Sequence, residues 1–423
     1  MNNSPKPLLK AGIISDIQAL PSRHDWGLHN FNAALKLLSK KGIDLLISAG
    51  DIAENGNPET YALYWELIAE NFPGKLPEHT GCEGNHDCNG KDEFPVAFAR
   101  ACKGLKRECV NPEHRVIGGY DFINFATFDK HHYSPGELPA LERELEKAVA
   151  RDPRKPVFVI THYPPADTVT GSHDNCGSQE LLQVFRKFPQ VVSLSGHTHC
   201  PLADERTIWQ GEFTAIETST LAYGCATEEK CFNTVGGILP FAREATEFLY
   251  MEIFEEKVMI YRYNAADGRE LGPAWQIDLP FDPAQARYTA EKRQAQSRAP
   301  EFASNADVLL RYDYGYCYII FDRPVKGDFA HFYDVEFSFF DEEKQEWLAP
   351  LSYHYISDFY RLACNRQEKI YLKLPETLEE NRLCRFRVYA VETFGKRSLP
   401  LEMECRIWPG YKFKEAKGLY PQE

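Results

Sequence analysis

The stretch that decides the fold is Ala11-Gly12-Ile13-Ile14-Ser15-Asp16-Ile17-Gln18. Its small and β-branched residues predict a buried strand, and the polar side chains of Asp16 and Gln18 follow directly after it. The same arrangement, an apolar run that ends in Asp, Asn or His, recurs further along the chain. The later motifs are Gly50-Asp51, Gly84-Asn85-His86-Asp87, His162 and Gly196-His197-Thr198-His199.

Strand-like and helix-like segments alternate between Leu8 and about Leu279. Such alternation, with strands covered on both faces, predicts an α/β fold, and by itself it favours a simple doubly wound sheet. The carboxyl ends of neighbouring strands would then bring the motifs together at one rim. Strands are expected at 11–15, 45–48, 157–160 and 191–194, helices at 31–40, 61–70 and 180–187, and a closing hairpin at 248–263.

Length and charge narrow the function classes. The chain has 423 residues, which favours two domains, and a formal net charge of −14, which argues against a nucleic-acid polymer as partner. An uninterrupted apolar stretch long enough for a membrane span is not found in the sequence, so we expect no membrane partner. The apolar run after Lys10 is broken by Asp16 and Gln18, which favours a cytoplasmic protein, with a removed leader as the alternative. The oligomeric state cannot be read from the sequence.

The side chains after the strands suit a pair of divalent cations. Two cations about 3.5–4 Å apart can bind a phosphate, activate a bridging water and stabilise both the attacking and the leaving oxygen. Asp51 is the expected bridge, Asn85 would offer its amide oxygen, and His162, His197 and His199 would offer ring nitrogens. Oxygen and imidazole ligands without cysteine fit manganese, iron or zinc better than a structural zinc site. The 12 cysteines lack a metal-binding spacing and are expected to be reduced thiols.

From Asp16 to His199 the chain resembles the calcineurin-like metallophosphoesterase family, whose GD, GNH(D/E), lone His and GHxH blocks are all intact. The resemblance implies a four-layer β-sandwich flanked by helices. It also implies that Asp16 and the GHxH histidines ligate two metals, that Asp51 bridges them, and that Asn85 binds one of them.

The same resemblance implies catalytic roles for two further residues. His86 would contact the phosphate and assist the leaving group, and Asp87 would orient His86.

One ligand position departs from the family pattern. Gln18 stands where the first motif, Asp-x-His, usually has histidine. An amide oxygen is a harder and weaker ligand than imidazole, so the first metal should bind less tightly and favour manganese or magnesium. A similar Asp-Ile-Gln occurs in the manganese-dependent ADP-ribose/CDP-alcohol diphosphatase branch, which points to a substrate carrying a nucleoside.

We therefore expect an enzyme with two divalent metal ions, manganese first and iron, zinc or magnesium as alternatives. It would cleave a small phosphodiester or nucleoside-diphosphate-type phosphoanhydride through a metal-bridging hydroxide. A phosphomonoesterase is the alternative among enzymes, because the metal centre is common to both. The alternative that is not an enzyme is a binding or scaffold protein on the same fold, with Gln18 as the first sign of lost metal affinity. A decayed site would be expected to lose several ligands, whereas Asn85, His86 and the GHxH block are intact.

The C-terminal part has a different pattern. A linker at 282–304, rich in Ala, Gln, Arg and Glu, separates the catalytic domain at 8–281 from a β-sandwich domain at 305–408. Phe386 to Gly395 resembles a late strand and turn of fibronectin type III modules, with Cys384 in place of the usual tyrosine. Because this region lacks an acid–histidine cluster, we expect a packing or recognition domain without catalytic residues.

Overall fold

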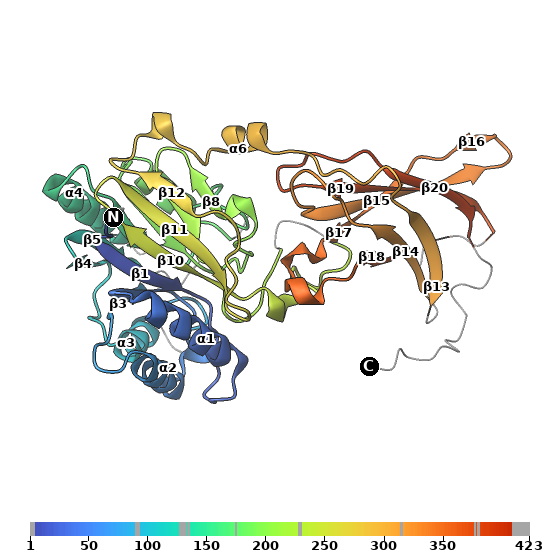
Figure 1. Ribbon diagram of the computed structural model, residues 1–423. Helices are drawn as coiled ribbons and strands as arrows, with labels where there is room; N and C mark the ends of the chain where they lie inside the picture. The colour runs from blue at the N-terminus through green and yellow to red at the C-terminus, as the bar shows by residue number, and fades with distance from the viewer. Residues whose placement is uncertain are drawn as a thin grey trace. The chain divides into compact units, whose positions relative to one another are not determined.

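The structure is a computed structural model. It describes residues 5–88, 94–126, 133, 136–173, 176–226, 231–313, 316–375, 378 and 381–407. The chain forms two compact units (Figure 1). The first contains Met1–Glu228 and Gly236–Arg293, and the second contains Glu229–Val235 and Gln294–Glu423.

Two six-stranded sheets form the centre of the first unit. The first sheet contains, in spatial order, β12 (Trp275–Asp278), β11 (Lys257–Asn264), β10 (Glu247–Ile253), β1 (Leu9–Ile14), β2 (Leu45–Ala49) and β3 (Glu78–Cys82). The second contains β4 (Glu113–Ile117), β5 (Tyr120–Asn124), β6 (Val157–Ile160), β7 (Val191–Ser195), β9 (Thr214–Glu217) and β8 (Ile208–Gln210). Parallel pairing joins β1 to β2 and β2 to β3 in the first sheet, and it joins β5, β6, β7 and β9 in the second.

Helices cover the outer face of each sheet. Phe31 and Tyr64 of the first two helices pack in one apolar cluster with Leu46 of β2, and Leu145 and Phe185 of two later helices pack in another with residues of β6. The helices of this unit are α1 (Trp26–Lys41), α2 (Pro58–Asn71), α3 (Phe94–Gly104), α4 (Glu137–Arg151), α5 (Gln179–Phe185) and the short 3-10 helices η1 (Glu54–Gly56), η2 (Glu205–Thr207), η3 (Ala242–Glu244) and η4 (Pro283–Gln285). A further helix, α6 (Ala290–Gln296), follows η4.

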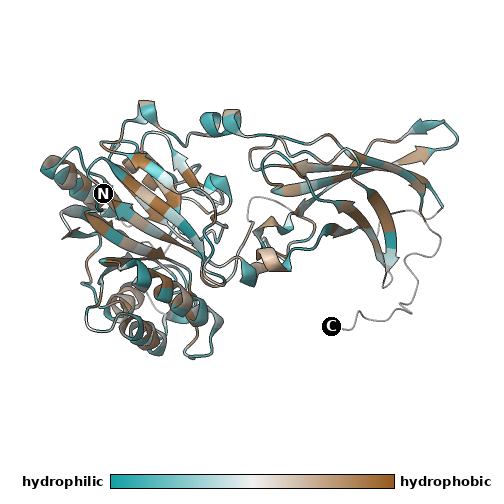
Figure 2. Cartoon of the chain, in the orientation of Figure 1, coloured by the Kyte–Doolittle hydropathy of each residue, from teal (hydrophilic) through white to brown (hydrophobic). Residues whose placement is uncertain are grey.

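The main core lies between the two sheets. Ile13 and Ile47 from the first sheet and Phe158 and Leu194 from the second are buried in one cluster, and the apolar colouring of the strands is visible in Figure 2. The order of layers is therefore helix, sheet, sheet, helix, and the β-sandwich flanked by helices is confirmed.

The single doubly wound sheet that the alternation favoured is wrong. Along β1, Ile13 faces the second sheet while Ile14 joins the cluster under the helices. A strand buried on both faces reads as one apolar run whether its second face meets a helix or another sheet, so periodicity cannot separate the two cases. The expected hairpin is confirmed, because β10 and β11 pair antiparallel with Met251 opposite Ile260.

The second unit is all-β. Its two antiparallel sheets share a core that contains Ile319 and Phe321 from one sheet and Val335 and Phe386 from the other. One sheet has β13 (Val308–Asp313), β14 (Tyr316–Asp322) and β18 (Lys369–Lys373), and the other has β16 (Glu346–Trp347), β15 (Phe332–Asp341), β19 (Leu383–Val391) and β20 (Leu401–Arg406), with β17 (Leu351–Ile356) paired to β15. Two 3-10 helices, η5 (Asp358–Tyr360) and η6 (Ala363–Asn365), follow β17. Residue 408, the end of the expected domain, lies outside the described residues.

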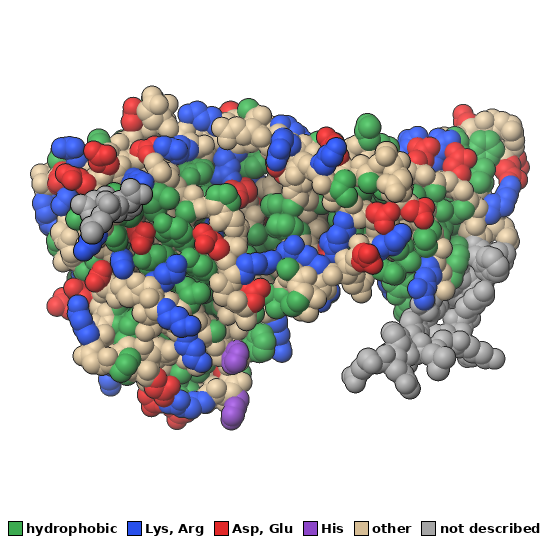
Figure 3. All heavy atoms as spheres, in the orientation of Figure 1, with side chains coloured by type: hydrophobic (Ala, Val, Ile, Leu, Met, Phe, Trp, Pro, Cys, Tyr) green, Lys and Arg blue, Asp and Glu red, His purple; other side chains and the backbone are tan. Residues whose placement is uncertain are grey.

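Basic and acidic side chains are interspersed on the face drawn in Figure 3. Among the described residues, no helix has both the length and the apolar character needed to cross a membrane.

Candidate metal centre

Strand ends from both sheets supply the predicted site residues. Asp16, Asp51 and Asn85 follow β1, β2 and β3 of the first sheet, whereas His162 and His197 follow β6 and β7 of the second. Backbone hydrogen bonds join neighbouring strand ends within each sheet: the Asp16 amide donates to the Gly50 carbonyl at 3.0 Å, and the Gly196 amide donates to the His162 carbonyl at 3.0 Å. The site therefore lies at the edge where the two sheets meet.

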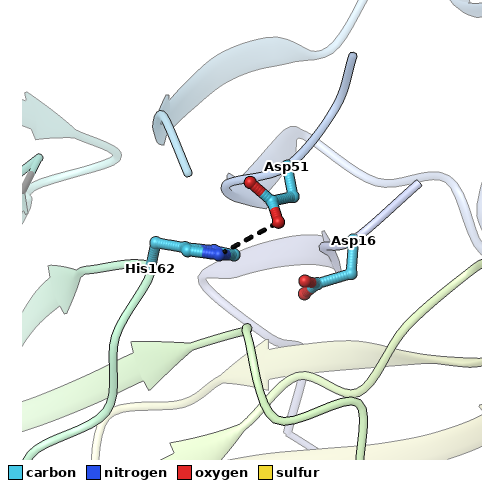
Figure 4. A group of neighbouring side chains, drawn as sticks. All are labelled: Asp16, Asp51 and His162. Carbon is cyan, nitrogen blue, oxygen red and sulfur yellow. Dashed lines mark ion pairs between the residues drawn. The ribbon is translucent and has the colours of Figure 1, made fainter. Parts of the chain in front are cut away.

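Asp51 is the centre of one half of the site. Its Oδ2 lies 3.2 Å from Nε2 of His162, and the same ring nitrogen lies 3.2 Å from the amide oxygen of Asn85. Its Oδ1 accepts a hydrogen bond of 2.7 Å from the His86 backbone amide. One ligand atom each from Asp16, Asp51 and His162 lie within 4.8 Å of one another, and all three residues are buried (Figure 4).

Asp16 is the centre of the other half. Its Oδ1 lies 3.0 Å from Nε2 of His199, and both of its oxygens accept from the His197 backbone amide, at 3.2 and 3.1 Å. The His197 ring lies beside the Asp51 half, with its centroid 5.1 Å from that of His162.

The two buried histidines share one orientation. Nδ1 of His162 donates to the Ala49 carbonyl at 2.9 Å, and Nδ1 of His199 donates to the Tyr223 carbonyl at 2.9 Å. In a neutral ring these bonds leave the lone pair on Nε2, so each Nε2 faces carboxylate oxygens as a second acceptor. This is the arrangement typical of metal-ligating histidines, whose other ring nitrogen is fixed by an outer partner.

Each of the two carboxylates in the site is paired with an imidazole. Burial opposes ionisation of Asp51, yet the His162 charge and the hydrogen bond to it hold the pKa of the Asp51 carboxyl below its ordinary value. Burial also opposes a charged ring at His162 and at His199, but Asp51 and Asp16 respectively raise the pKa of each imidazole. Two carboxylates, an amide oxygen and ring lone pairs that converge in a buried space fit divalent cations with mixed oxygen and nitrogen ligands.

The backbone at the site is strained and closely packed. Asp16, Gln18, Asp51, His197 and His199 all have left-handed φ values, between 45° and 74°. Non-glycine residues rarely adopt this region, and functional sites are where such strain concentrates. Two motif glycines make room for the carboxylates: a Cβ on Gly84 would lie 2.1 Å from Asp51 Oδ1, and one on Gly196 would lie 2.3 Å from Asp16 Oδ2.

Gln18, the departure from the family pattern, also reaches the site. Its backbone amide donates to the Asp51 carbonyl at 2.8 Å, and its Nε2 lies 3.4 Å from Asp51 Oδ2. The side chain is half-buried, so an amide stands beside the carboxylate at the place where the family has an imidazole.

The hydrogen bonds around His86 differ from expectation. The carboxylate at the His86 ring is that of Glu54, with Oε2 2.9 Å from Nδ1, and not that of Asp87. Asp87 is buried and accepts from the amides of Ala53 and Gly84, both at 2.9 Å, and from the Tyr61 hydroxyl at 2.7 Å. The expected role of Asp87 in orienting His86 is therefore corrected: Asp87 ties the two motif loops together instead.

Three further residues at the site are not part of the sequence motifs. Glu54 comes three residues after Asp51, and an acid in that loop was a usable signal. Tyr163 donates from its hydroxyl to the amide oxygen of Asn85 at 3.1 Å. Tyr223 has its ring centroid 4.5 Å from that of His199.

Part of the chain is similar to known proteins. Residues 9–201 match the model of the family described as calcineurin-like phosphoesterase. A 3',5'-cyclic-nucleotide phosphodiesterase from Nostoc sp. is 28% identical over 194 residues, which cover 40% of this chain and 62% of the relative. A probable glycerophosphodiester phosphodiesterase from Arcobacter nitrofigilis is 26% identical over 178 residues, which cover 37% of this chain and 56% of the relative. The chain thus spans less than two thirds of the length of both relatives.

A solved structure of a purple acid phosphatase from yellow lupin (Lupinus luteus) seeds aligns with a TM-score of 0.47 and 13% sequence identity. That alignment covers 65% of this chain and 55% of the lupin chain.

Proposed function

We propose that the protein is a dinuclear metal-dependent phosphohydrolase of the calcineurin-like phosphoesterase family, whose model residues 9–201 match. Its substrate would be a small phosphodiester or a nucleoside-diphosphate-type phosphoanhydride. The observation that carries the proposal is the convergence of Asp16, Asp51 and His162, from two different sheets, within 4.8 Å.

The proposed ligands form two groups that share Asp51. They are Asp16, Gln18 and His199 on one side, and Asn85, His162 and His197 on the other. When bound, two divalent ions withdraw charge from the phosphate oxygens and lower the pKa of a coordinated water, and manganese is our first choice. Iron, zinc and magnesium are the alternatives.

His86 would act on the leaving group. Its Nδ1 faces Glu54, which leaves Nε2 to carry the proton exchange with a phosphate or leaving oxygen. The side chain is 35% exposed, so substrate can reach the ring, whereas the ligands Asp51 and His162 are buried. A ring that Glu54 holds at Nδ1 and that substrate can reach at Nε2 suits a general acid.

The names of the relatives favour a diester, since both are called phosphodiesterases. Gln18 favours manganese or magnesium and a substrate with a nucleoside. A phosphomonoesterase and a non-catalytic scaffold remain the alternatives, and a cytoplasmic location stays a prediction.

For the all-β unit we propose a packing or recognition role. The fibronectin type III likeness and the domain limits 8–281, 282–304 and 305–408 also stay predictions.

The first test is hydrolysis of bis-p-nitrophenyl phosphate by metal-stripped full-length protein, with and without added manganese. We expect turnover that depends on manganese and that His86→Ala reduces strongly while manganese binding is retained. Turnover would justify a comparison of ADP-ribose, CDP-alcohols and cyclic nucleotides as substrates. Folded protein that hydrolyses neither this diester nor p-nitrophenyl phosphate with any divalent metal would overturn the proposal and favour the scaffold alternative.

A further inference from the structure

Tyr163 touches two proposed ligands from different motifs. It follows His162 directly, and only 3% of its surface is exposed. Its hydroxyl donates to the amide oxygen of Asn85 at 3.1 Å, and its ring centroid lies 4.3 Å from that of His197. The side chain therefore links the Gly84–Asp87 loop to the Gly196–His199 loop behind the Asp51 half of the site.

An asparagine ligand can be presented in two ways. Rotation about its terminal bond exchanges the amide oxygen, which accepts, for the NH₂ group, which donates. Only the orientation with the oxygen inward can bind a cation. The inward oxygen of Asn85 lies 3.2 Å from Nε2 of His162, and Nδ1 of that ring already donates to the Ala49 carbonyl.

The amide has most reason to turn before an ion binds. A neutral His162 ring without a proton on Nε2 faces the Asn85 oxygen as a second acceptor, and only a bound ion would accept the lone pairs of both. An outward oxygen and an inward NH₂ would relieve this clash of acceptors but would close the metal position. Such a rotation would also reverse the 3.1 Å hydrogen bond of the buried Tyr163 hydroxyl, which would have to accept from the NH₂ group and lose Asn85 as the acceptor of its own proton.

We propose that Tyr163 is a positioning residue whose hydroxyl holds the Asn85 amide with its oxygen toward the metal, and thereby sets the affinity of the Asp51 half of the site for its ion. This inference rests on the proposed function, because it assumes that Asn85 is a ligand. It assigns to Tyr163 no contact with substrate.

The test is Tyr163→Phe, which removes only the hydroxyl oxygen. Manganese is titrated into metal-free full-length protein by calorimetry. We expect one of two binding events to weaken by roughly 10-fold, the loss typical when an outer partner of a ligand is removed. Tyr64→Phe is the matched control, because the Tyr64 hydroxyl is also buried but contacts His79, outside the site, at 2.9 Å. The control should bind manganese like the unaltered protein.

A double-mutant cycle with Asn85→Asp separates orientation from packing. A carboxylate presents an oxygen in either orientation, so Tyr163→Phe should cost little in the Asn85→Asp background if the hydroxyl acts by fixing the amide. Equal losses in both backgrounds would overturn the inference, as would unchanged affinity in Tyr163→Phe alone. If the unaltered protein binds no divalent metal, the proposed function itself fails, which is a distinct result.

Discussion

Oε2 of Glu54 lies 2.9 Å from Nδ1 of His86. A backbone bond strengthens the pairing, since the Gly56 amide donates to the His86 carbonyl at 3.0 Å. Helix η1 therefore holds His86 by both backbone and side chain. The His86 amide in turn donates to Asp51 Oδ1, so the proposed acid and the proposed bridging ligand are placed relative to each other.

Glu54→Ala should lower kcat by roughly 10-fold or more, because the His86 ring loses the acceptor that fixes its tautomer. Steady-state kinetics with bis-p-nitrophenyl phosphate measure the effect, and manganese affinity should stay unchanged. The exposed Glu59→Ala, at the start of α2, is the control for loss of a nearby acid. A kcat equal to that of the unaltered protein would refute an orienting role for Glu54.

Gly84→Ala should impair metal binding. The new Cβ would lie 2.1 Å from Asp51 Oδ1 and 2.7 Å from Cγ, so the carboxylate must move. We expect manganese affinity, measured by calorimetry, to fall by roughly 10-fold or more, as for other changes that displace a ligand. Gly12→Ala is the comparison, since the three atoms nearest its Cβ would all belong to the Leu38 side chain, away from the site. Equal affinities for Gly84→Ala and the unaltered protein would show that Asp51 is not a ligand in this position.

Gln18→His restores the usual family ligand and should tighten binding at the Asp16 side. Because imidazole is a softer ligand than an amide, the preference should also shift from manganese toward zinc or iron. Competition between manganese and zinc at equilibrium measures the shift. For a manganese enzyme the unaltered protein must already be active, so activity that emerges only in Gln18→His would support the scaffold alternative.

Glu247 should make stability depend on pH. Burial raises the pKa of its carboxyl to about 7, although the Leu202 amide and the Arg262 charge act in the opposite direction. A raised folded-state pKa means that the folded protein binds the proton more tightly. The stabilisation is therefore complete below the unfolded value near 4.5 and is lost as pH rises through about 7.

Glu247→Gln removes this titration. The difference in unfolding free energy between the variant and the unaltered protein should change, in favour of the variant, by on the order of 3 kcal/mol between pH 4 and pH 8. Urea unfolding of the first unit at several pH values measures it. A difference that is constant across this range would contradict the raised pKa.

The convergence of the motif side chains could be predicted because each motif gives a local signal. Each motif residue follows its own strand, and a strand end can be recognised within a few residues. The structure brings the side chains of Asp16, Asp51 and His162 within 4.8 Å, as two-metal chemistry at the strand ends requires. The assignment of these side chains as ligands stays a prediction.

The partners of the ligands could not be predicted, because they depend on packing between distant segments. Asp87 binds Tyr61, a residue of α2, only because that helix packs over β2. Glu54 reaches His86 from η1, which is itself bonded to the His86 loop through the Gly56 amide. The division of the strands into two sheets could not be predicted either. Because β1 is buried on both faces, its sequence does not show whether a helix or a second sheet covers each face.

The two sheets also divide the donor set, with Asp16, Asp51 and Asn85 on one and the histidines on the other. Neither sheet alone can complete the site, so an ion bound there would act as a cross-link between segments that are distant in the chain. Chelation would then loosen the sandwich at its rim as well as stop turnover, much as reducing a disulfide loosens a small secreted domain. A bound ion would then contribute to folding stability as well as to catalysis.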